Sequence, residues 1–189
     1  ERRMSAGKPC LSLTVAQGFL KEKKMDLIVR QLSELGATRF VPFVCERAVV
    51  RPDAGRGSFR RERWHKIAVE SLKQCRRGDV LAIEEVHGFD ALLARGREHD
   101  LALLFWEEAT APIPLLPAGR PKPASVMAVL GPEGGFSAAE AQAAAAAGFH
   151  LVRLGPRIIK AETADIAAAA ILQHLFGDLG AGEKPLDKA

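Results

Sequence analysis

Short apolar runs alternate with longer amphipathic stretches along most of the chain. The apolar runs have the length and composition of buried β-strands, and they occupy residues 11–16, 38–44, 80–83, 101–105, 126–130 and 151–154. Between several of them, apolar residues at spacings of three and four predict helices, as in Met25, Ile28, Val29, Leu32 and Leu35. Strands that alternate with helices predict an α/β fold, in which a mostly parallel sheet is flanked by helices.

Two glycine–proline loops follow the last two predicted strands. The first is Leu130-Gly131-Pro132-Glu133-Gly134-Gly135-Phe136-Ser137, and the second is Leu154-Gly155-Pro156-Arg157-Ile158-Ile159-Lys160-Ala161-Glu162-Thr163-Ala164. Ser137 and Glu140 form a Ser-x-x-Glu capping box, which predicts that a helix begins after the first loop. Ordinary strand-to-helix turns also use Gly and Pro. Because ligands of open parallel sheets bind at the carboxyl ends of the strands, the two glycine–proline loops together predict a binding site at that edge of the sheet.

The first loop does not match the common phosphate-binding motifs. A P-loop needs Gly-Lys followed by Ser or Thr, and no such residues occur between Gly131 and Ser137. Gly131, Gly134 and Gly135 also lack the spacing of the dinucleotide motif G-x-G-x-x-G.

Length and composition agree with a single compact domain. The chain has 189 residues, of which 48% are hydrophobic and 26% charged, enough for one sizeable core. A net charge of +4 permits a nucleic-acid partner without requiring one. Cys10, Cys45 and Cys75 are scattered, which predicts neither a disulfide framework nor a metal site. The sequence shows no secretory signal and no membrane-spanning run, so we expect a cytoplasmic protein with no membrane partner.

The two loops resemble those of the RsmE family of bacterial ribosomal RNA methyltransferases. The resemblance rests on LGPEGGFS and LGPRIIKAETA, extends from about residue 11 to residue 179, and includes Lys24-Met25-Asp26, Pro42 and Arg47. It implies an S-adenosylmethionine-dependent enzyme that methylates N3 of a uridine in small-subunit (16S) ribosomal RNA. It also implies a SPOUT-type fold with a C-terminal trefoil knot, a feature too rare to be inferred from periodicity.

The resemblance also implies roles for individual residues. Arg157 would hold the uracil oxygens or a phosphate, and Glu162 would assist the loss of the N3 proton. The alternatives are a solvated loop cation for Arg157 and a charge at a helix N-terminus for Glu162. Lys160 and Ala161 depart from the Arg and Thr that are more usual in the family. The cofactor would contact Phe105, Glu107, Leu130, Gly131, Pro132, Glu133, Gly134, Gly135, Leu154, Gly155, Arg157, Ile158, Ile159, Ala161 and Thr163.

A basic region precedes the two loops, and we expect it to contact RNA. Such a region is more often a solvated face, but a polyanionic substrate favours phosphate contacts. We expect RNA to contact Arg47, Gln74, Arg77 and Lys160, with Gln74 and Arg77 facing the active site. The target base would be unpaired, because Watson–Crick pairing occupies N3. The region comprises Arg47, Arg51, Arg56, Arg60, Arg61, Arg63, Lys66, Lys73, Arg76 and Arg77.

The expected organisation is one catalytic domain with short flanks. Residues 1–9 would be the remnant of a linker to an absent N-terminal PUA-like domain, residues 10–180 the SPOUT domain, and residues 181–189 a flexible tail. The predicted helix 163–176 combines small alanines with large apolar residues, which suits either a core helix or the homodimer contact usual in SPOUT proteins. Two other functions stay open: a SPOUT methyltransferase for a tRNA base or ribose 2′-hydroxyl, and a non-catalytic RNA-binding module.

Overall fold

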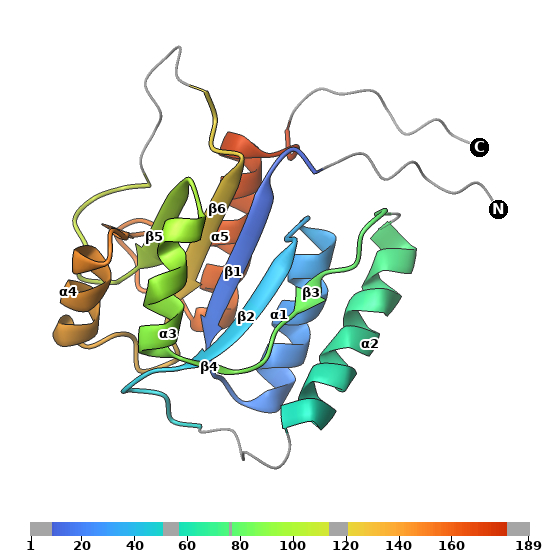
Figure 1. Ribbon diagram of the computed structural model, residues 1–189, viewed down its shortest axis with the longest axis horizontal. Helices are drawn as coiled ribbons and strands as arrows, with labels where there is room; N and C mark the ends of the chain where they lie inside the picture. Colours follow the sequence, from blue (N-terminus) through green and yellow to red (C-terminus); the bar gives the residue numbers. More distant parts are fainter. Residues whose placement is uncertain (1–8, 51–56, 76, 114–120, 181–189) are drawn as a thin grey trace.

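A sheet of parallel strands forms the centre of the molecule (Figure 1). The computed structural model describes residues 9–50, 57–75, 77–113 and 121–180. Within them the strand order is β3–β2–β1–β6–β5–β7, with the short β4 paired to β2, and every recorded pairing is parallel. The strands are β1 Ser12–Gly18, β2 Arg39–Val44, β3 Ala82–Ile83, β4 His87–Gly88, β5 Leu101–Phe105, β6 Ser125–Leu130 and β7 His150–Val152.

Helices cover both faces of the sheet, which confirms the predicted α/β architecture (Figure 1). One face carries α1 Glu22–Glu34, α2 Gly57–Cys75 and α5 Ala161–Phe176. The other carries α3 Phe89–Ala94, which the 3₁₀ turn η2 Arg95–Glu98 follows directly in the chain, and α4 Ala138–Ala146. No described helix is long and apolar enough to cross a membrane.

The continuous apolar strands are explained by burial on two sides. Leu13 and Val15 of β1 belong to the core beneath α1, α2 and α5, whereas Ala16 belongs to the core beneath α3 and α4. Since successive strand residues point to opposite faces, a strand covered on both must be apolar at nearly every position. The helix predicted after Ser137 is α4, and its capping box has both hydrogen bonds.

Several predicted boundaries were wrong by two or more residues. The predicted strand 151–154 is His150–Val152, so Leu154 lies in a loop, and the helix predicted from Thr163 begins at Ala161. The run 80–83 pairs only at Ala82 and Ile83, and β4 was not predicted because His87 and Gly88 give no apolar signal. Residues 1–8, the predicted tail 181–189, and Arg51, Arg56 and Arg76 lie outside the described residues.

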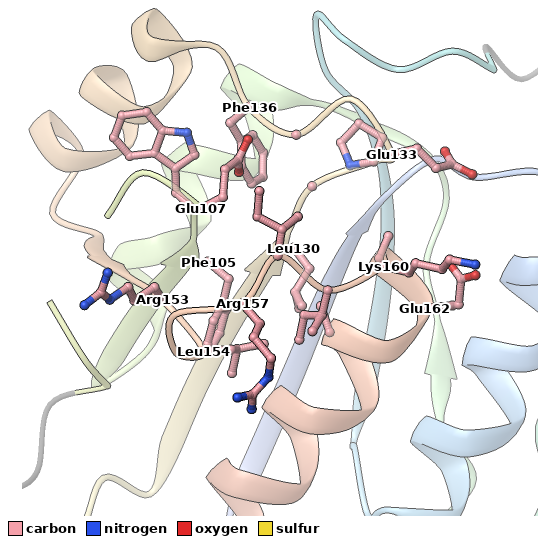
Figure 2. A pocket seen from close by; sticks show the side chains of 18 of the residues that line it. Phe105, Glu107, Leu130, Glu133, Phe136, Arg153, Leu154, Arg157, Lys160 and Glu162 are labelled. Carbon is pink, nitrogen blue, oxygen red and sulfur yellow. The ribbon is translucent and has the colours of Figure 1, made fainter. Parts of the chain in front are cut away.

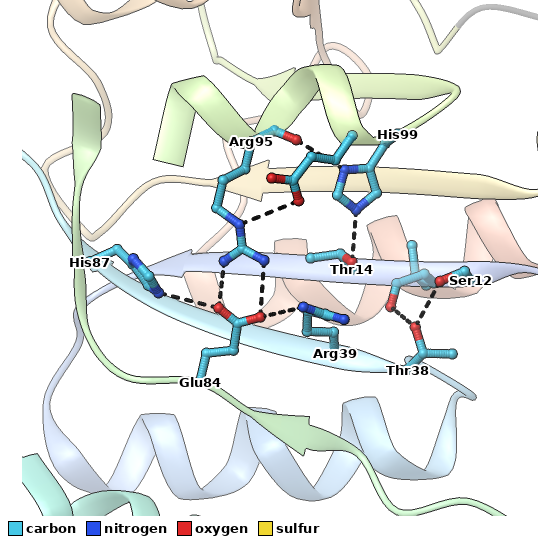
Figure 3. A network of polar contacts seen from close by, with 10 residues as sticks. Ser12, Thr14, Thr38, Arg39, Glu84, His87, Arg95 and His99 are labelled. Atoms are coloured by element: carbon cyan, nitrogen blue, oxygen red, sulfur yellow. Dashed lines mark hydrogen bonds and ion pairs between the residues drawn. The ribbon is translucent and has the colours of Figure 1, made fainter. Parts of the chain in front are cut away.

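A polar network centred on Glu84 joins η2 to the sheet toward the amino ends of β1 and β2 (Figure 3). The Glu84 carboxylate accepts hydrogen bonds from both terminal nitrogens of Arg95 and, at 2.7 Å, from Arg39. Burial alone would raise the pKa of Glu84, but the hydrogen bonds from Arg95 and Arg39 outweigh it and lower the pKa to about 2. The network therefore stabilises the fold at the edge opposite the two glycine loops.

Asp165 is a buried acid in the second turn of α5. It is 0% exposed, and neither carboxyl oxygen has a hydrogen-bond partner among the described residues. Burial raises the pKa of Asp165 well above its usual value, and the nearby charge of Glu162 raises it further. The folded state thus favours the protonated acid, and an unpartnered polar group of this kind costs stability.

We predict that Asp165→Asn removes a pH-dependent penalty on folding. The pKa is higher in the folded than in the unfolded state, so the parent protein loses stability as the pH rises above about 4, where the unfolded chain releases the proton that the folded chain retains. At pH 8 the variant should be more stable by about 1–3 kcal/mol, and near pH 4 the two should be similar.

Urea unfolding at the two pH values measures this difference. Asp100→Asn is the control, and its effect on the pH dependence of stability should have the opposite sign. The Asp100 carboxylate accepts hydrogen bonds from the backbone N–H groups of Ser125 and Ala124, which lower its pKa. Parallel pH dependences in the parent and in Asp165→Asn would show that Asp165 is not protonated on folding.

Candidate functional site

A pocket of about 600 Å³ lies at the carboxyl edge of the sheet (Figure 2). Its walls are the loops that follow β5, β6 and β7, together with the first turn of α5 and Lys24 of α1. These loops meet because β6, β5 and β7 are neighbours in the sheet and run in the same direction. The predicted convergence of the two glycine–proline loops is confirmed.

The loop after β6 is fixed at both of its ends. At its start, the side-chain amide of Gln17 at the end of β1 donates a hydrogen bond of 2.9 Å to the Gly131 carbonyl. At its end, Phe136 is buried and its ring lies parallel to that of Phe43 at a centroid distance of 6.2 Å. The capping box of α4 then starts at Ser137. The loop therefore presents its backbone to the pocket from a rigid support.

The glycines of this loop are required by protein contacts. A Cβ at Gly134 would lie 2.8 Å from the Arg47 carbonyl oxygen, and one at Gly135 would lie 2.5 Å from a carboxylate oxygen of Glu107. Gly135 also has a φ of +65°, which favours glycine. Both glycines were predicted to contact the cofactor, but the groups closest to their Cβ positions are Arg47 and Glu107.

In the loop after β7, the glycine is not packed against other protein groups. Gly155 has a φ of +128°, and a Cβ built there would meet nothing within 4 Å, so this position does open onto free space. The chain then passes through the exposed residues Arg157 and Ile158 to Lys160, whose carbonyl accepts hydrogen bonds of 2.9 Å from the N–H groups of Thr163 and Ala164. The loop thus runs directly into the N-terminus of α5.

The loop after β5 forms the third wall. Trp106 donates its backbone N–H to the Val152 carbonyl at 2.9 Å, which holds this loop against β7. The Trp106 indole N–H is buried and has no partner among the described residues. Because a buried donor normally has an acceptor, this N–H is an unsatisfied polar group within the wall of the pocket.

A lysine at one side of the pocket joins the first glycine–proline loop to the first turn of α5, where the second loop ends. The Lys24 ammonium lies 2.9 Å from Glu133 Oε1 and 3.2 Å from Glu162 Oε2. The hydrogen bond to Glu133 raises the pKa of Lys24, partial burial opposes it, and Glu162 adds to the increase. The backbone N–H of Glu162 lowers the pKa of its own carboxyl, burial opposes this, and Lys24 and Lys160 lower it further. Glu162 is therefore ionised at neutral pH.

Most of the predicted cofactor residues line this pocket. Thr163 is the exception, because it is exposed on the first turn of α5 and faces away. The predicted residues that line the pocket are Phe105, Glu107, Leu130, Gly131, Pro132, Glu133, Gly134, Gly135, Leu154, Gly155, Arg157, Ile158, Ile159 and Ala161, together with Lys160 and Glu162. The pocket is also lined by residues that were not among the predicted cofactor contacts: Lys24, Trp106, Phe136, Arg153, Pro156 and Ala164.

The expected RNA-contact residues are divided. Lys160 lines the pocket, and Arg47 lies behind the first loop, with its guanidinium 3.5 Å from the Gly134 carbonyl oxygen. Gln74 and Arg77 do not face the pocket within one chain. Arg77 instead donates hydrogen bonds to the carbonyls of Ser33 and Ala37, at 2.7 and 3.0 Å, at the carboxyl end of α1. The sequence around Arg77 is basic and therefore did not predict these hydrogen bonds to backbone carbonyls.

The donors and acceptors of the pocket suit an organic ligand with both apolar and charged parts. The volume is within the range of small-molecule sites, and the lining combines backbone groups with Leu130, Leu154 and Ile159 and with side chains of both charges. Among the described residues, no group of three or more His, Cys, Asp or Glu is placed to hold a metal ion.

Known proteins with this sequence pattern act on RNA. An RNA methyltransferase domain family matches residues 7–173. The ribosomal RNA small subunit methyltransferase E of Bacillus subtilis is 33% identical over 169 residues, which cover 87% of this chain and 66% of that protein. Its namesake from Buchnera aphidicola subsp. Schizaphis graminum is 31% identical, with coverages of 89% and 68%.

A solved structure gives the same relationship in three dimensions. The crystal structure of a ribosomal RNA small subunit methyltransferase E from Neisseria gonorrhoeae, bound to S-adenosyl methionine, has a TM-score of 0.79 and 30% identity to this chain, with coverages of 89% of this chain and 68% of that one. The chain thus spans about two thirds of the length of these relatives. Since the matched domain includes both glycine–proline loops, the chain belongs to the RsmE family of RNA methyltransferases.

Proposed function

We propose that this chain is an S-adenosylmethionine-dependent methyltransferase that acts on N3 of a uridine in small-subunit ribosomal RNA. The observation that carries the proposal is the pocket between the two Leu-Gly-Pro loops, in a domain 30% identical to a ribosomal RNA methyltransferase with S-adenosyl methionine bound. The choice of ribosomal RNA follows from the relatives, and the choice of uridine N3 follows from the family resemblance.

Features of the pocket fit S-adenosylmethionine. Leu130, Leu154 and Ile159 offer apolar contacts, and the glycine-rich stretch Gly134–Gly135 and Gly155 bring backbone groups to the pocket wall. The open space beside Gly155 allows a ligand to approach the backbone there. When bound, the cofactor supplies an electrophilic methyl group on its sulfonium sulfur. The protein must then exclude water and hold the acceptor nitrogen in line with that methyl group, which contributes much of the rate.

Glu162 and Arg157 are the residues that we assign to the acceptor. N3 of uridine carries a weakly acidic proton that must leave as the nitrogen attacks, and the ionised Glu162 carboxylate can accept it. The lowered pKa makes Glu162 a weak base, so it assists as the proton becomes acidic during the attack. Arg157 is exposed at the rim of the pocket (Figure 2), where its guanidinium can bind the uracil oxygens as negative charge develops on them.

Lys160 and Arg47 would position the RNA. Lys160 is exposed beside the pocket, and Arg47 lies on the other side of the first loop. Contacts of these cations with phosphates would orient the strand without reading its sequence. The target uridine would enter as an unpaired base, because N3 is otherwise occupied in pairing.

We also propose the trefoil knot and the homodimer that the resemblance implies. The knot is supported by the hydrogen bond of 3.0 Å from the Arg153 N–H to the Ala111 carbonyl, because the chain leaving β7 here runs beside the β5–β6 connection. The dimer is supported by Ile171, which is 36% exposed on α5, and by Ile158, which is 88% exposed in the second loop. Exposed apolar residues of this size suit a protein contact. A ribosomal RNA substrate favours a cytoplasmic location.

We predict that the chain binds S-adenosylmethionine and that Ala161→Leu weakens this binding roughly ten-fold or more, because overfilling a packed site costs about 1–3 kcal/mol. Ala161 lines the pocket in the first turn of α5. Thr163→Leu is the matched control, since Thr163 lies in the same turn and is exposed outside the pocket. Calorimetric titration measures both, and equal affinities would contradict the assignment of the pocket. Tight cofactor binding without methyl transfer to ribosomal RNA would favour a non-catalytic module.

We predict that Glu162→Gln slows methyl transfer by roughly two orders of magnitude at neutral pH, because the amide cannot accept the N3 proton. The rate should recover in part as the pH rises and uridine ionises without assistance. Single-turnover assays on ribosomal RNA across the pH range give the result. An unaltered rate at every pH would leave Glu162 as a charge at the N-terminus of α5.

We predict that Ile171→Asp converts a dimer into a monomer, because the interface would have to bury an unpaired charge. Phe59→Asp is the control, since Phe59 is 68% exposed on α2, which α1 separates from α5 (Figure 1). Sedimentation velocity at micromolar concentration distinguishes the species. A monomeric parent protein would contradict the proposed dimer.

A further inference from the structure

Lys24 connects three parts of the pocket that are far apart in the sequence. It lies in the first turn of α1, Glu133 lies in the loop after β6, and Glu162 lies in the first turn of α5. Its ammonium nitrogen is 2.9 Å from Glu133 Oε1 and 3.2 Å from Glu162 Oε2. Figure 2 shows Glu133, on the first glycine–proline loop, and Glu162, where the second loop enters α5, on the same side of the pocket.

We infer that Lys24 is a positioning residue for the cofactor, whose ammonium holds the two glycine–proline loops at the separation that S-adenosylmethionine requires. This inference rests on the proposed function, because it concerns the affinity for that cofactor. Lys24 does not need to touch the reacting atoms for this role. It acts through the carboxylates of Glu133 and Glu162.

The two carboxylates would repel each other without the lysine. Both lie close to one nitrogen, so their separation cannot exceed the sum of two short distances. Lys24 turns this unfavourable pair into two attractive contacts. The other titratable groups near Glu162 are Lys160, at the end of the second loop, and Asp165, one turn further along α5, whose folded form favours the neutral acid. Lys160 partly offsets the repulsion, but in the described part of the chain the ion-pair partner of Glu133 is Lys24, so Lys160 does not join the loops.

The effect should appear in ligand affinity more than in overall stability. The side chains of Lys24, Glu133 and Glu162 are 32%, 31% and 21% exposed, and partly exposed ion pairs contribute little to folding. The two loops, in contrast, have no strand pairing with each other, because β5 lies between β6 and β7. A charged link between them can therefore set the width of the pocket while leaving the core unchanged.

The experiment measures the dissociation constant of S-adenosylmethionine in a set of variants by calorimetry. Lys24→Met keeps most of the length of the side chain and removes its charge, and we expect the dissociation constant to rise roughly ten-fold. Lys24→Arg should restore most of the affinity. Lys24→Met combined with Glu133→Gln should also restore most of it, because the repulsion is gone. Lys23→Met, at an exposed lysine one residue earlier, should change nothing.

Acidic pH provides a readout that a general loss of stability would not give. In Lys24→Met, lowering the pH from about 7.5 to about 5 promotes protonation of one of the two adjacent carboxylates, so the affinity should recover in part. The parent protein should show no such gain. Thermal unfolding of the same variants should differ little.

The outcomes separate the two proposals. If the parent protein does not bind S-adenosylmethionine, the proposed function is overturned and the role of Lys24 with it. If the parent binds and Lys24→Met binds equally well, only the inference on Lys24 is overturned. A weaker Lys24→Met that is not rescued by Glu133→Gln or by acidic pH would also overturn it.

Discussion

The pairing of β1 with β6 is the contact on which the site depends. These strands are parallel and in register from Ser12 opposite Ser125 to Gln17 opposite Leu130, so both end at the same edge of the sheet. The Gln17 side chain then extends the pairing by one step through its hydrogen bond to the Gly131 carbonyl. A shift of one residue would reverse the faces of the strand and remove Gln17 from the loop. The position of the first wall of the pocket is thus fixed before any ligand is present.

The local signals in the sequence predicted most of the fold. Strands β1, β2, β5 and β6 are buried on both faces, so each appears as an apolar run, and Ser137 with Glu140 marked the start of α4. The short β4 gave no signal, because two residues are too few for a pattern. The start of α5 at Ala161 was also missed, since its first turn serves the pocket and lacks a side-chain cap.

The site was predicted where motifs contain it and missed where tertiary contacts create it. The residues of the two loops are contiguous in sequence, so they could be found together. Lys24 joins the site only because α1 returns along the sheet beside α5, and nothing in the sequence around it specifies Glu133 as its partner. Arg77 shows the converse, because a cation in a basic stretch is used to satisfy the carbonyls of Ser33 and Ala37 at the end of α1. Charge alone could not distinguish these uses.

The same strand order has a consequence for the synthesis of the protein. The side chain of Gln17 and the carbonyl of Gly131 are 114 residues apart in the chain, so β1 leaves the ribosome long before its partner β6. At about 5–20 residues per second, one edge of β1 waits roughly ten seconds for that partner. Until then it can pair with β2 alone, and contacts of such long range slow folding. Nascent chains therefore pass through a stage with an open, apolar strand edge, which is prone to pair with other chains. A chaperone would prevent aggregation most effectively at this stage.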